Sequence, residues 1–170
     1  MSHIIILGSS RSFGNTKKAV DIIIGDNNIP VIDLRTLNIT PYDYEYNNSS
    51  DDFMPTMRYV MNFDTIIFAT PVYWYTMSAT MKIFVDRIAD LLTPRTDLAQ
   101  KLRGKKLFVI ASFANAYTEG FEDIFLNTAK YLEIDYLGTS FIYSGTANQE
   151  LLNNNISQIK KAREALGIVI

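Results

Sequence analysis

Short apolar runs alternate with segments of helical periodicity along this chain, and the alternation limits its fold more than any other feature. The first run, Ile-Ile-Ile-Leu at residues 4–7, is uninterrupted, as expected for a strand that a parallel sheet buries on both faces. The runs predict five strands, at residues 4–7, 29–34, 64–70, 107–112 and 136–143. Apolar side chains at helical spacing predict helices at residues 16–24, 77–92, 121–132 and 152–166, and a shorter helix after residue 52.

Strands that alternate with helices imply a parallel sheet with helices on both faces. Right-handed crossovers leave few arrangements, and five strands suit the doubly wound order 2-1-3-4-5. We therefore predict a three-layer α/β fold with a five-stranded parallel sheet, formed by residues 1–170 as a single domain. Ligands of such sheets bind beyond the carboxyl ends of the strands, so the candidate site lies in the loops at residues 8–16, 71–76, 112–117 and 144–146.

The composition excludes several kinds of protein. The chain has no cysteine, which rules out disulfides, thiolate metal sites and thiol redox centres, and which fits a reducing environment. The formal net charge is −2 and no cluster of Lys and Arg compensates for it, so we expect no nucleic-acid binding. The apolar run near the N-terminus is too short to span a membrane and follows no basic region. We therefore expect a cytoplasmic protein without membrane contact.

The sequence offers no set of nucleophile, base and orienting group. Its one histidine, His3, stands at the start of a buried strand, and we predict a structural role for it. Arg87 and Asp90 are expected to form an ordinary i,i+3 helix pair worth a few tenths of a kcal/mol. We predict no catalytic side chain and no metal site, which suits an enzyme whose cofactor carries the chemistry.

The loop after the first strand carries groups that suit a phosphate. Gly8 permits a tight backbone exit, Arg11 offers a fixed positive fork, and a helix begins directly after the loop. The candidate ligands are Ser9, Arg11, Ser12, Asn15 and Thr16. The loop lacks the glycines of a dinucleotide-binding turn and the Gly-Lys-Ser/Thr ending of a P-loop, so we interpret it as a site for one terminal phosphate. The alternative is an ordinary turn whose hydroxyls cap the helix.

A second loop, Thr-Pro-Val-Tyr-Trp-Tyr-Thr at residues 70–76, is rich in aromatic side chains. Pro71 makes the exit from the strand rigid, and Tyr73, Trp74 and Tyr75 offer flat surfaces at the predicted ligand edge. A conjugated ring could stack there, with about 0.5–1.5 kcal/mol per aromatic pair beyond area burial. The alternative is a turn whose aromatics pack on the following helix or on another subunit.

Three segments together resemble one family of proteins. SSRSFGNT at residues 9–16, DTIIFATPVYWYTMSATMKIFVDR at 64–87 and LRGKKLFVIAS at 102–112 are similar to the flavodoxin-like NAD(P)H-dependent FMN oxidoreductases, which include FMN reductases and quinone reductases. The resemblance implies a flavodoxin-like fold with FMN as cofactor and NADH or NADPH as co-substrate. It places the FMN phosphate on the loop residues named above, and the ribityl chain and ring edge on Pro71, Val72, Tyr73 and Trp74. It places the far side of the ring by Ser112, Phe113, Ala114 and Asn115.

The same resemblance implies an activity. Hydride passes from NAD(P)H to the flavin and on to a small acceptor, such as a quinone, an azo or nitro compound or free flavin, by ping-pong turnover in a homodimer. The alternative is a flavodoxin-type electron carrier, which the weak net charge of −2 supports poorly. Many relatives carry cysteines after the second strand, where this chain has Tyr42, Tyr44 and Tyr46. These tyrosines either cover a neighbouring subunit's flavin or pack against their own fold.

Overall fold

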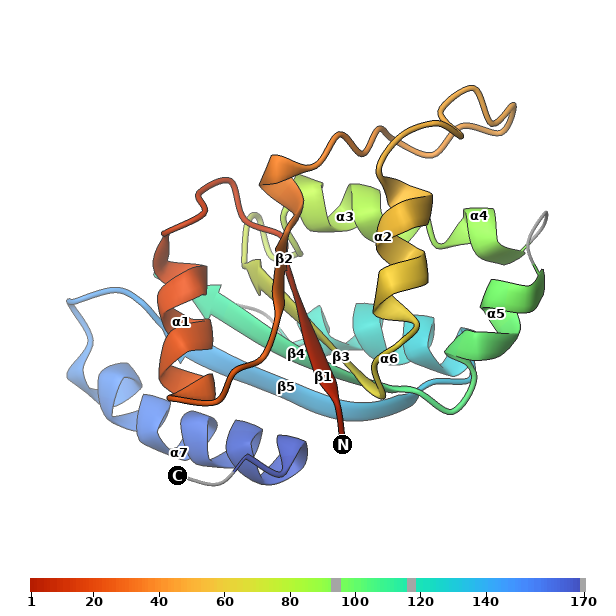
Figure 1. Cartoon of the computed structure of the whole chain (residues 1–170). Helices are drawn as coiled ribbons and strands as arrows, with labels where there is room; N and C mark the ends of the chain where they lie inside the picture. The colour runs from red at the N-terminus through yellow and green to blue at the C-terminus, as the bar shows by residue number, and fades with distance from the viewer. Residues whose placement is uncertain (93–95, 116–118, 169–170) are drawn as a thin grey trace.

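The computed structural model describes residues 1–92, 96–115 and 119–168. Its sheet has the strand order β2-β1-β3-β4-β5, and every neighbouring pair is parallel (Figure 1). The strands are β1 (His3–Leu7), β2 (Val31–Asp33), β3 (Thr65–Pro71), β4 (Lys106–Phe113) and β5 (Asp135–Tyr143). This order confirms the predicted doubly wound, flavodoxin-like arrangement, and it puts β2 with the preceding Pro30 at an edge.

Helices cover both faces of the sheet (Figure 1). One layer consists of α1 (Asn15–Ile24) and α7 (Gln149–Leu166). The other consists of α2 (Phe53–Val60), α3 (Ala79–Asp86), α4 (Ala89–Leu92), α5 (Thr96–Leu102) and α6 (Phe121–Tyr131). A short 3-10 helix, η1 (Leu34–Thr36), follows β2. Within the described ranges, no helix is long and apolar enough to cross a membrane.

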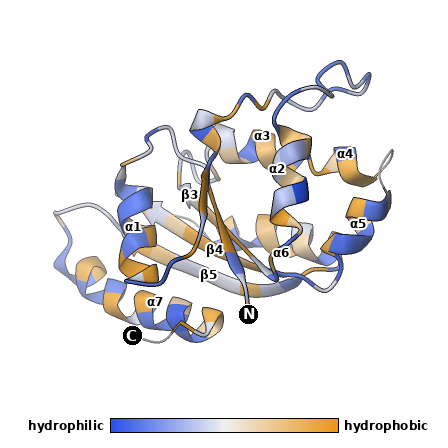
Figure 2. Ribbon diagram, in the orientation of Figure 1, coloured by the Kyte–Doolittle hydropathy of each residue, from blue (hydrophilic) through white to orange (hydrophobic). Residues whose placement is uncertain are grey.

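The strands separate two hydrophobic clusters, one on each face of the sheet. Ile4 and Ile6 of β1 pack in the cluster of the α2 layer, whereas Ile5 and Leu7 pack in the cluster of the α1 and α7 layer. This alternation follows from the two-residue period of a strand. Because both of their faces are buried, the inner strands β1, β3 and β4 are mostly apolar, and orange stretches mark them in Figure 2.

The outer edge of β5 is covered by side chains of α7. The Asn155 side chain accepts from the amide of Tyr143 at 2.8 Å and donates to the carbonyl of the same residue at 2.9 Å. The Gln158 side chain accepts from the amide of Phe141 at 3.1 Å. These bonds occupy backbone groups that an edge strand otherwise offers to another chain.

The helix predicted over residues 77–92 is two helices, α3 and α4. Ser78 is the N-cap of α3, and its hydroxyl accepts from the amide of Met81 at 3.1 Å, so Met77 precedes the helix. The amides of Ile88 and Asp90 bond to carbonyls three residues earlier, which separates the two helices at Arg87. The predicted connection between this region and β4 contains α5, a short helix that the sequence interpretation missed.

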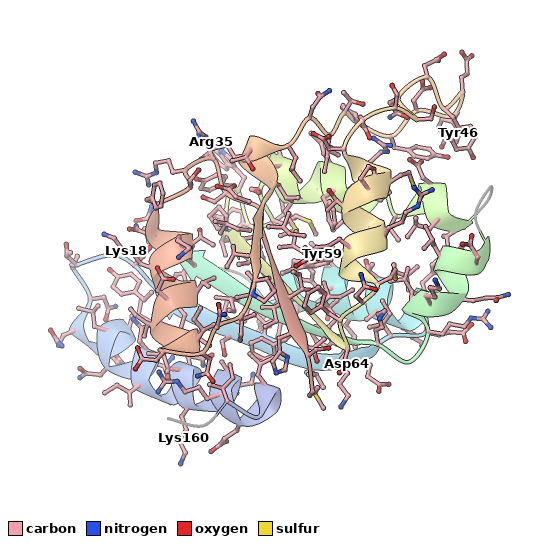
Figure 3. All side chains as sticks on the ribbon, viewed as in Figure 1. Lys18, Arg35, Tyr46, Tyr59, Asp64 and Lys160 are labelled. Atoms are coloured by element: carbon pink, nitrogen blue, oxygen red, sulfur yellow. The ribbon has the colours of Figure 1, made fainter. Side chains whose placement is uncertain are left out.

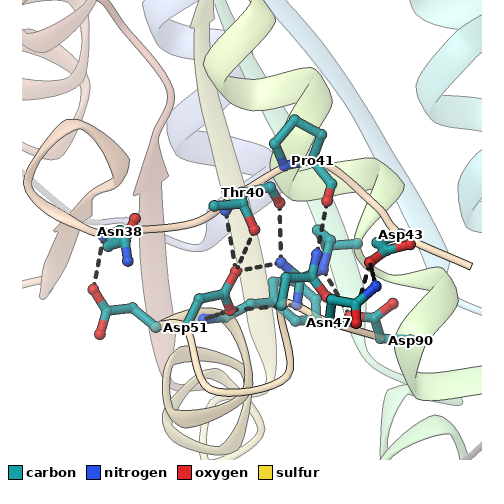
Figure 4. A network of polar contacts seen from close by, with 11 residues as sticks. Asn38, Thr40, Pro41, Asp43, Asn47, Asp51 and Asp90 are labelled. Atoms are coloured by element: carbon teal, nitrogen blue, oxygen red, sulfur yellow. Dashed lines mark hydrogen bonds and ion pairs between the residues drawn. The ribbon is translucent and has the colours of Figure 1, made fainter. Parts of the chain in front are cut away.

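At this break the Arg87 side chain is fully buried and forms ion pairs with the carboxylates of Asp51 and Asp90, both of which Figure 4 labels. Its Nη1 lies 2.5 Å from Asp51 Oδ2 and its Nε lies 2.7 Å from Asp90 Oδ2. Nη1 also donates to the carbonyl of Thr40 at 3.0 Å, and the guanidinium carbon lies 4.8 Å from the centre of the Phe53 ring. The predicted i,i+3 pair of Arg87 and Asp90 is confirmed, but the expectation that it is an ordinary helix pair worth a few tenths of a kcal/mol was wrong, because both side chains are buried. The buried cation connects the long segment 37–52 to α3 and α4.

The Asp51 carboxylate is the other centre of this network. Its Oδ2 accepts from the amide and hydroxyl of Thr40 at 3.0 and 3.1 Å, and its Oδ1 accepts from the amide of Phe53 at 3.0 Å. Burial opposes ionisation, but the bonds from Arg87, Thr40 and Phe53 hold the pKa of Asp51 below its ordinary value. The ionised form therefore stabilises the folded state at neutral pH.

We expect Asp51→Asn to lower the free energy of unfolding at pH 7 by about 3 kcal/mol or more, because Arg87 then keeps only one of its two buried carboxylates. The contribution of Asp51 is present above its unfolded pKa of about 3.9 and is lost as pH falls through the lower folded-state pKa. Denaturant unfolding at pH 7 and at pH values below about 4 should show a shallower acid dependence in the variant than in the wild type.

The matched control is Asp52→Asn, which changes the neighbouring carboxylate in the same way. Asp52 accepts one exposed hydrogen bond from the Asn38 amide, and within the described residues it forms no ion pair with a buried cation. Equal losses of stability in the two variants would contradict the central role of the Arg87 network.

Candidate functional site

The four predicted loops meet at the carboxyl ends of β1, β3, β4 and β5, where the amide of Ser144 after β5 donates to the carbonyl of Phe113 at 2.7 Å. The amide of Gly8 donates to the carbonyl of Ala69 at 2.8 Å, and the amide of Val72 donates to the carbonyl of Ser112 at 2.8 Å. The hydroxyl of Ser78 donates to the carbonyl of Gly8 at 2.6 Å. These bonds hold the loops after β1, β3 and β4 in fixed positions relative to one another.

Gly8 is required for a reason that differs from the predicted one. It is not among the residues with positive φ, so the turn does not demand glycine for its backbone angles. A Cβ at this position would lie 2.7 Å from Met81 Cβ and 3.0 Å from Met81 Cα. Gly8 therefore allows the start of α3 to pack directly against the end of β1.

Among the described residues, no side chain caps the N-terminus of α1. Its N-cap is Gly14, and its first turn contains no acidic residue. The amides of Asn15, Thr16 and Lys17 are the first-turn donors that a helix cannot satisfy by itself. A Cβ on Gly14 would lie 3.2 Å from Arg11 Cβ and 3.5 Å from Arg11 Nε, so the Arg11 side chain folds over the cap. Donors, a helix N-terminus and a guanidinium together suit an anion.

The predicted phosphate residues differ in their exposure. Arg11 and Asn15 are exposed and Ser12 is half-buried, so all three can reach a ligand. Ser9 is buried, and its hydroxyl accepts from the amide of Arg11 at 3.3 Å. Thr16 is 2% exposed, and its side chain is directed into the protein rather than towards the loop surface. The amide of Thr16 is the part of this residue that is available to an anion.

The Thr16 hydroxyl bonds to a second predicted site residue. Thr16 Oγ1 lies 2.8 Å from Ser112 Oγ, and both side chains are buried. The pair connects the start of α1 to the end of β4. Both hydroxyls therefore bond within the protein and stabilise the contact between α1 and β4.

The aromatic turn has a strained backbone. Tyr73 and Thr76 exchange two backbone hydrogen bonds, at 2.9 and 3.1 Å, around Trp74 and Tyr75. Both central residues have positive φ, 48° and 66°, as in a type I′ turn, where Asn and Gly are the usual residues. Each costs about 1–3 kcal/mol in this conformation, and such strain concentrates at functional sites. The turn leaves the Trp74 side chain 93% exposed.

A cavity of about 390 Å³ lies between the aromatic turn and the loop after β4. It is lined by Val72, Tyr73, Trp74, Tyr75, Ala114 and Asn115. Pro71 and Phe113 are buried and support the two loops from below. The predicted loop 112–117 ends at Tyr117, which lies outside the described residues.

The proposed anion site, formed by Arg11 and the N-terminus of α1, is connected to the cavity. Ser10 Oγ lies 3.2 Å from the Tyr73 hydroxyl, so the loop after β1 reaches the aromatic turn directly. The combined site has donors and positive charge at one end and flat apolar surfaces at the other, which suits a ligand with a phosphate and a planar ring.

His3 lies at the opposite end of β1, half-buried, and burial lowers its pKa.

Sequence reasoning missed Arg35 at this site. Its Nη1 donates to Ser12 Oγ at 3.4 Å from the turn that follows β2. No local motif marks Arg35, because the contact joins two loops. The predicted strand order could have indicated this contact, because it places the turn after β2 beside the loop after β1.

The tyrosines of the segment 37–52 lie outside this set of contacts. The rings of Tyr42 and Tyr44 pack edge to face with centroids 5.0 Å apart, and Tyr44 is 84% exposed. Tyr46 is half-buried and has a positive φ of 56°. Tyr42 and Tyr44 thus contact each other within the chain. That these tyrosines cover the flavin of a neighbouring subunit stays a prediction.

Comparison with known proteins identifies relatives over most of the chain. Residues 1–123 match the family described as NADPH-dependent FMN reductase. The NAD(P)H-dependent FMN-containing oxidoreductase YwqN of Bacillus subtilis is 31% identical over 115 residues, which are 63% of this chain and 64% of that protein. The match thus spans less than two thirds of the length of this curated relative.

Solved structures show the same fold at lower identity. The Trp repressor binding protein from Bacillus subtilis has a TM-score of 0.74 and 22% identity, with 99% of each chain covered. An FMN-dependent NADH-azoreductase from Bacillus anthracis, solved with FMN, has a TM-score of 0.70 and 15% identity, with 98% of this chain and 99% of that chain covered. At these identities the likeness supports the fold.

We expect Thr16→Val to lower the free energy of unfolding by about 1–3 kcal/mol, because the buried Ser112 hydroxyl then lacks its partner. Thr16→Ser keeps the hydroxyl and should lose less stability. Denaturant unfolding of the two variants measures the difference. If Thr16→Val and Thr16→Ser are equally stable, the hydroxyl pair does not stabilise the junction of α1 and β4.

Proposed function

Because this chain belongs to the NADPH-dependent FMN reductase family, whose cofactor is FMN and whose electron donor is a reduced nicotinamide, we propose that it is an NAD(P)H-dependent FMN oxidoreductase. FMN supplies the hydride chemistry when it is bound, and the protein supplies binding, orientation and electrostatics. The observation that carries the proposal is the uncapped N-terminus of α1 beside Arg11, joined through Ser10 and Tyr73 to an aromatic cavity.

The donor set fits the FMN phosphate. The amides of Asn15, Thr16 and Lys17 would bind it together with Arg11 and the Ser12 hydroxyl. Hydrogen bonds to a charged group contribute about 1.5–3 kcal/mol each, so a few of them anchor one end of the cofactor. The buried hydroxyl of Thr16 positions α1 and makes no direct bond in this proposal.

The ring end has a different chemistry. Val72, Tyr73 and Trp74 would line the ribityl chain and the ring edge, with Pro71 holding the turn in place. The loop at residues 112–115 would lie by the far side of the ring. Backbone amides in that loop would be available as donors where negative charge develops.

The acceptor and the kinetic order are part of the same proposal. With the FMN ring in the cavity beside the aromatic turn, NADH or NADPH and then a small planar acceptor would stack in succession on the open side of the ring, which is ping-pong turnover. A quinone, an azo or nitro compound or free flavin has the required flat shape. We also propose that residues 1–170 form one FMN-binding domain, and that the protein is a homodimer located in the cytoplasm. Exposed aromatics support the dimer, since Phe13 and Trp74 are 87% and 93% exposed.

The direct test of the proposal is purification of the protein followed by an assay. We expect a yellow protein that releases FMN on denaturation and oxidises NADH or NADPH in the presence of a quinone or an azo dye. A protein that binds FMN but accepts electrons from neither nicotinamide would support the flavodoxin-type carrier instead. A colourless protein that does not bind added FMN would exclude both.

A double variant tests the phosphate assignment. Arg11→Ala with Ser12→Ala should weaken FMN binding by about 100-fold, because a charged and a neutral donor are lost. Riboflavin, which has no phosphate, should bind equally well to the wild type and the variant. Fluorescence titration measures both affinities, with Arg58→Ala on the exposed face of α2 as the charge-matched control. Equal weakening of FMN and riboflavin would contradict the assignment.

A further inference from the structure

The turn after β2 brings a second arginine to the phosphate loop. Arg35 lies in η1, and the parallel pairing of β2 with β1 puts this turn beside the loop that joins β1 to α1 (Figure 3). The Asp33 carboxylate accepts from the Arg35 amide at 3.0 Å, and the Thr36 hydroxyl donates to the Asp33 carbonyl at 2.8 Å. The backbone that carries Arg35 is therefore fixed by its own turn, independently of any ligand.

The guanidinium of Arg35 faces a group already assigned to the phosphate. Its Nη1 donates to Ser12 Oγ at 3.4 Å. A serine hydroxyl has one proton to donate and two lone pairs to accept. If Arg35 occupies a lone pair, the hydroxyl proton stays free to point at an anion. The remaining donors of the guanidinium fork are free to reach the same anion from the side of β2.

The charges around the loop are unbalanced. In the described part of the chain, neither Arg11 nor Arg35 forms an ion pair with a carboxylate, although six such pairs occur elsewhere. The adjacent first turn of α1 also lacks acidic residues. The carboxylate in this region is that of Asp33, which accepts from the Arg35 amide, and within the described residues it forms no ion pair with either guanidinium. Arg11, Arg35 and the N-terminus of α1 thus bring positive charge to the loop after β1. A phosphate monoester, which carries about −1.5 to −2 near pH 7, matches this charge better than a singly charged anion does.

We propose that Arg35 is a second phosphate-binding cation, which completes the FMN phosphate site from the turn after β2 and makes the site selective for the dianionic monoester. This inference rests on the proposed function and assigns it a residue outside the loop 8–16. Arg35 acts both directly, through its free donors, and through Ser12, whose hydroxyl it orients. The selectivity favours FMN over riboflavin, which lacks the phosphate.

Three variants separate the charge from the hydrogen bond. Arg35→Gln keeps a donor but loses the charge, Arg35→Lys keeps the charge, and Arg58→Ala removes an exposed arginine on α2 as the matched control. Fluorescence titration of protein freed of flavin measures the affinity for FMN and for riboflavin. We expect Arg35→Gln to weaken FMN binding about 10- to 100-fold and to leave riboflavin binding unchanged. Arg35→Lys should weaken FMN binding less, and Arg58→Ala should not change it.

The phosphate itself provides a second readout, which needs no activity. In a ³¹P NMR titration, the wild type should hold the pKa of the bound FMN phosphate below its free value of about 6, and Arg35→Gln should bring it back towards that value. Thermal unfolding of the flavin-free variants should match the wild type, because Arg35 is exposed.

The outcomes distinguish this inference from the proposed function. If the wild type binds FMN and Arg35→Gln binds it within twofold of the wild type, the role of Arg35 is wrong and the reductase proposal stands. Equal weakening of FMN and riboflavin in Arg35→Gln would also overturn the inference, since it indicates a role in the shape of the loop. If the wild type binds no FMN, the proposed function fails first.

Discussion

The N-terminus of α1, which follows the loop after β1 and has no side-chain cap in the described part of the chain, is the constraint on which the site depends. Gly14 provides no side chain to satisfy the first-turn amides of α1, and the neighbouring Thr16 hydroxyl is bonded to Ser112 inside the protein. The amides therefore remain available to an anion, and the helix dipole adds to the charge of Arg11. A phosphate bound there fixes one end of FMN, and the aromatic cavity receives the ring.

The rest of the fold fixes the positions of the loops that form the site. Hydrogen bonds of Gly8 and Ser78 join the end of β1 to β3 and to the start of α3, and close packing of Met81 excludes a larger residue at Gly8. On the far side of α3, Arg87 fastens the segment 37–52 through buried carboxylates (Figure 4). The energetic cost of the strained turn at Trp74 is borne by this surrounding structure.

The sheet could be predicted because burial on both faces leaves continuous apolar runs, and the handedness of crossovers then leaves few strand orders. The phosphate loop and the aromatic turn were found for a related reason, since each is contiguous in sequence. Contacts between distant segments could not be read in this way. The burial of Arg87 depends on Asp51, 36 residues away, and the contact of Arg35 with Ser12 depends on strand pairing. The inward direction of the Thr16 hydroxyl likewise depends on Ser112 of β4.

The measurement that tests this account most directly is the amide NMR spectrum of isotope-labelled, flavin-free protein during addition of FMN and, separately, of riboflavin. The account predicts that FMN shifts the amide resonances of Asn15, Thr16 and Lys17 strongly, because these donors bind the phosphate. Riboflavin should shift resonances of the aromatic turn and leave those three in place. If saturating FMN leaves all three amides unchanged, the N-terminus of α1 does not bind the phosphate, and the central claim is wrong.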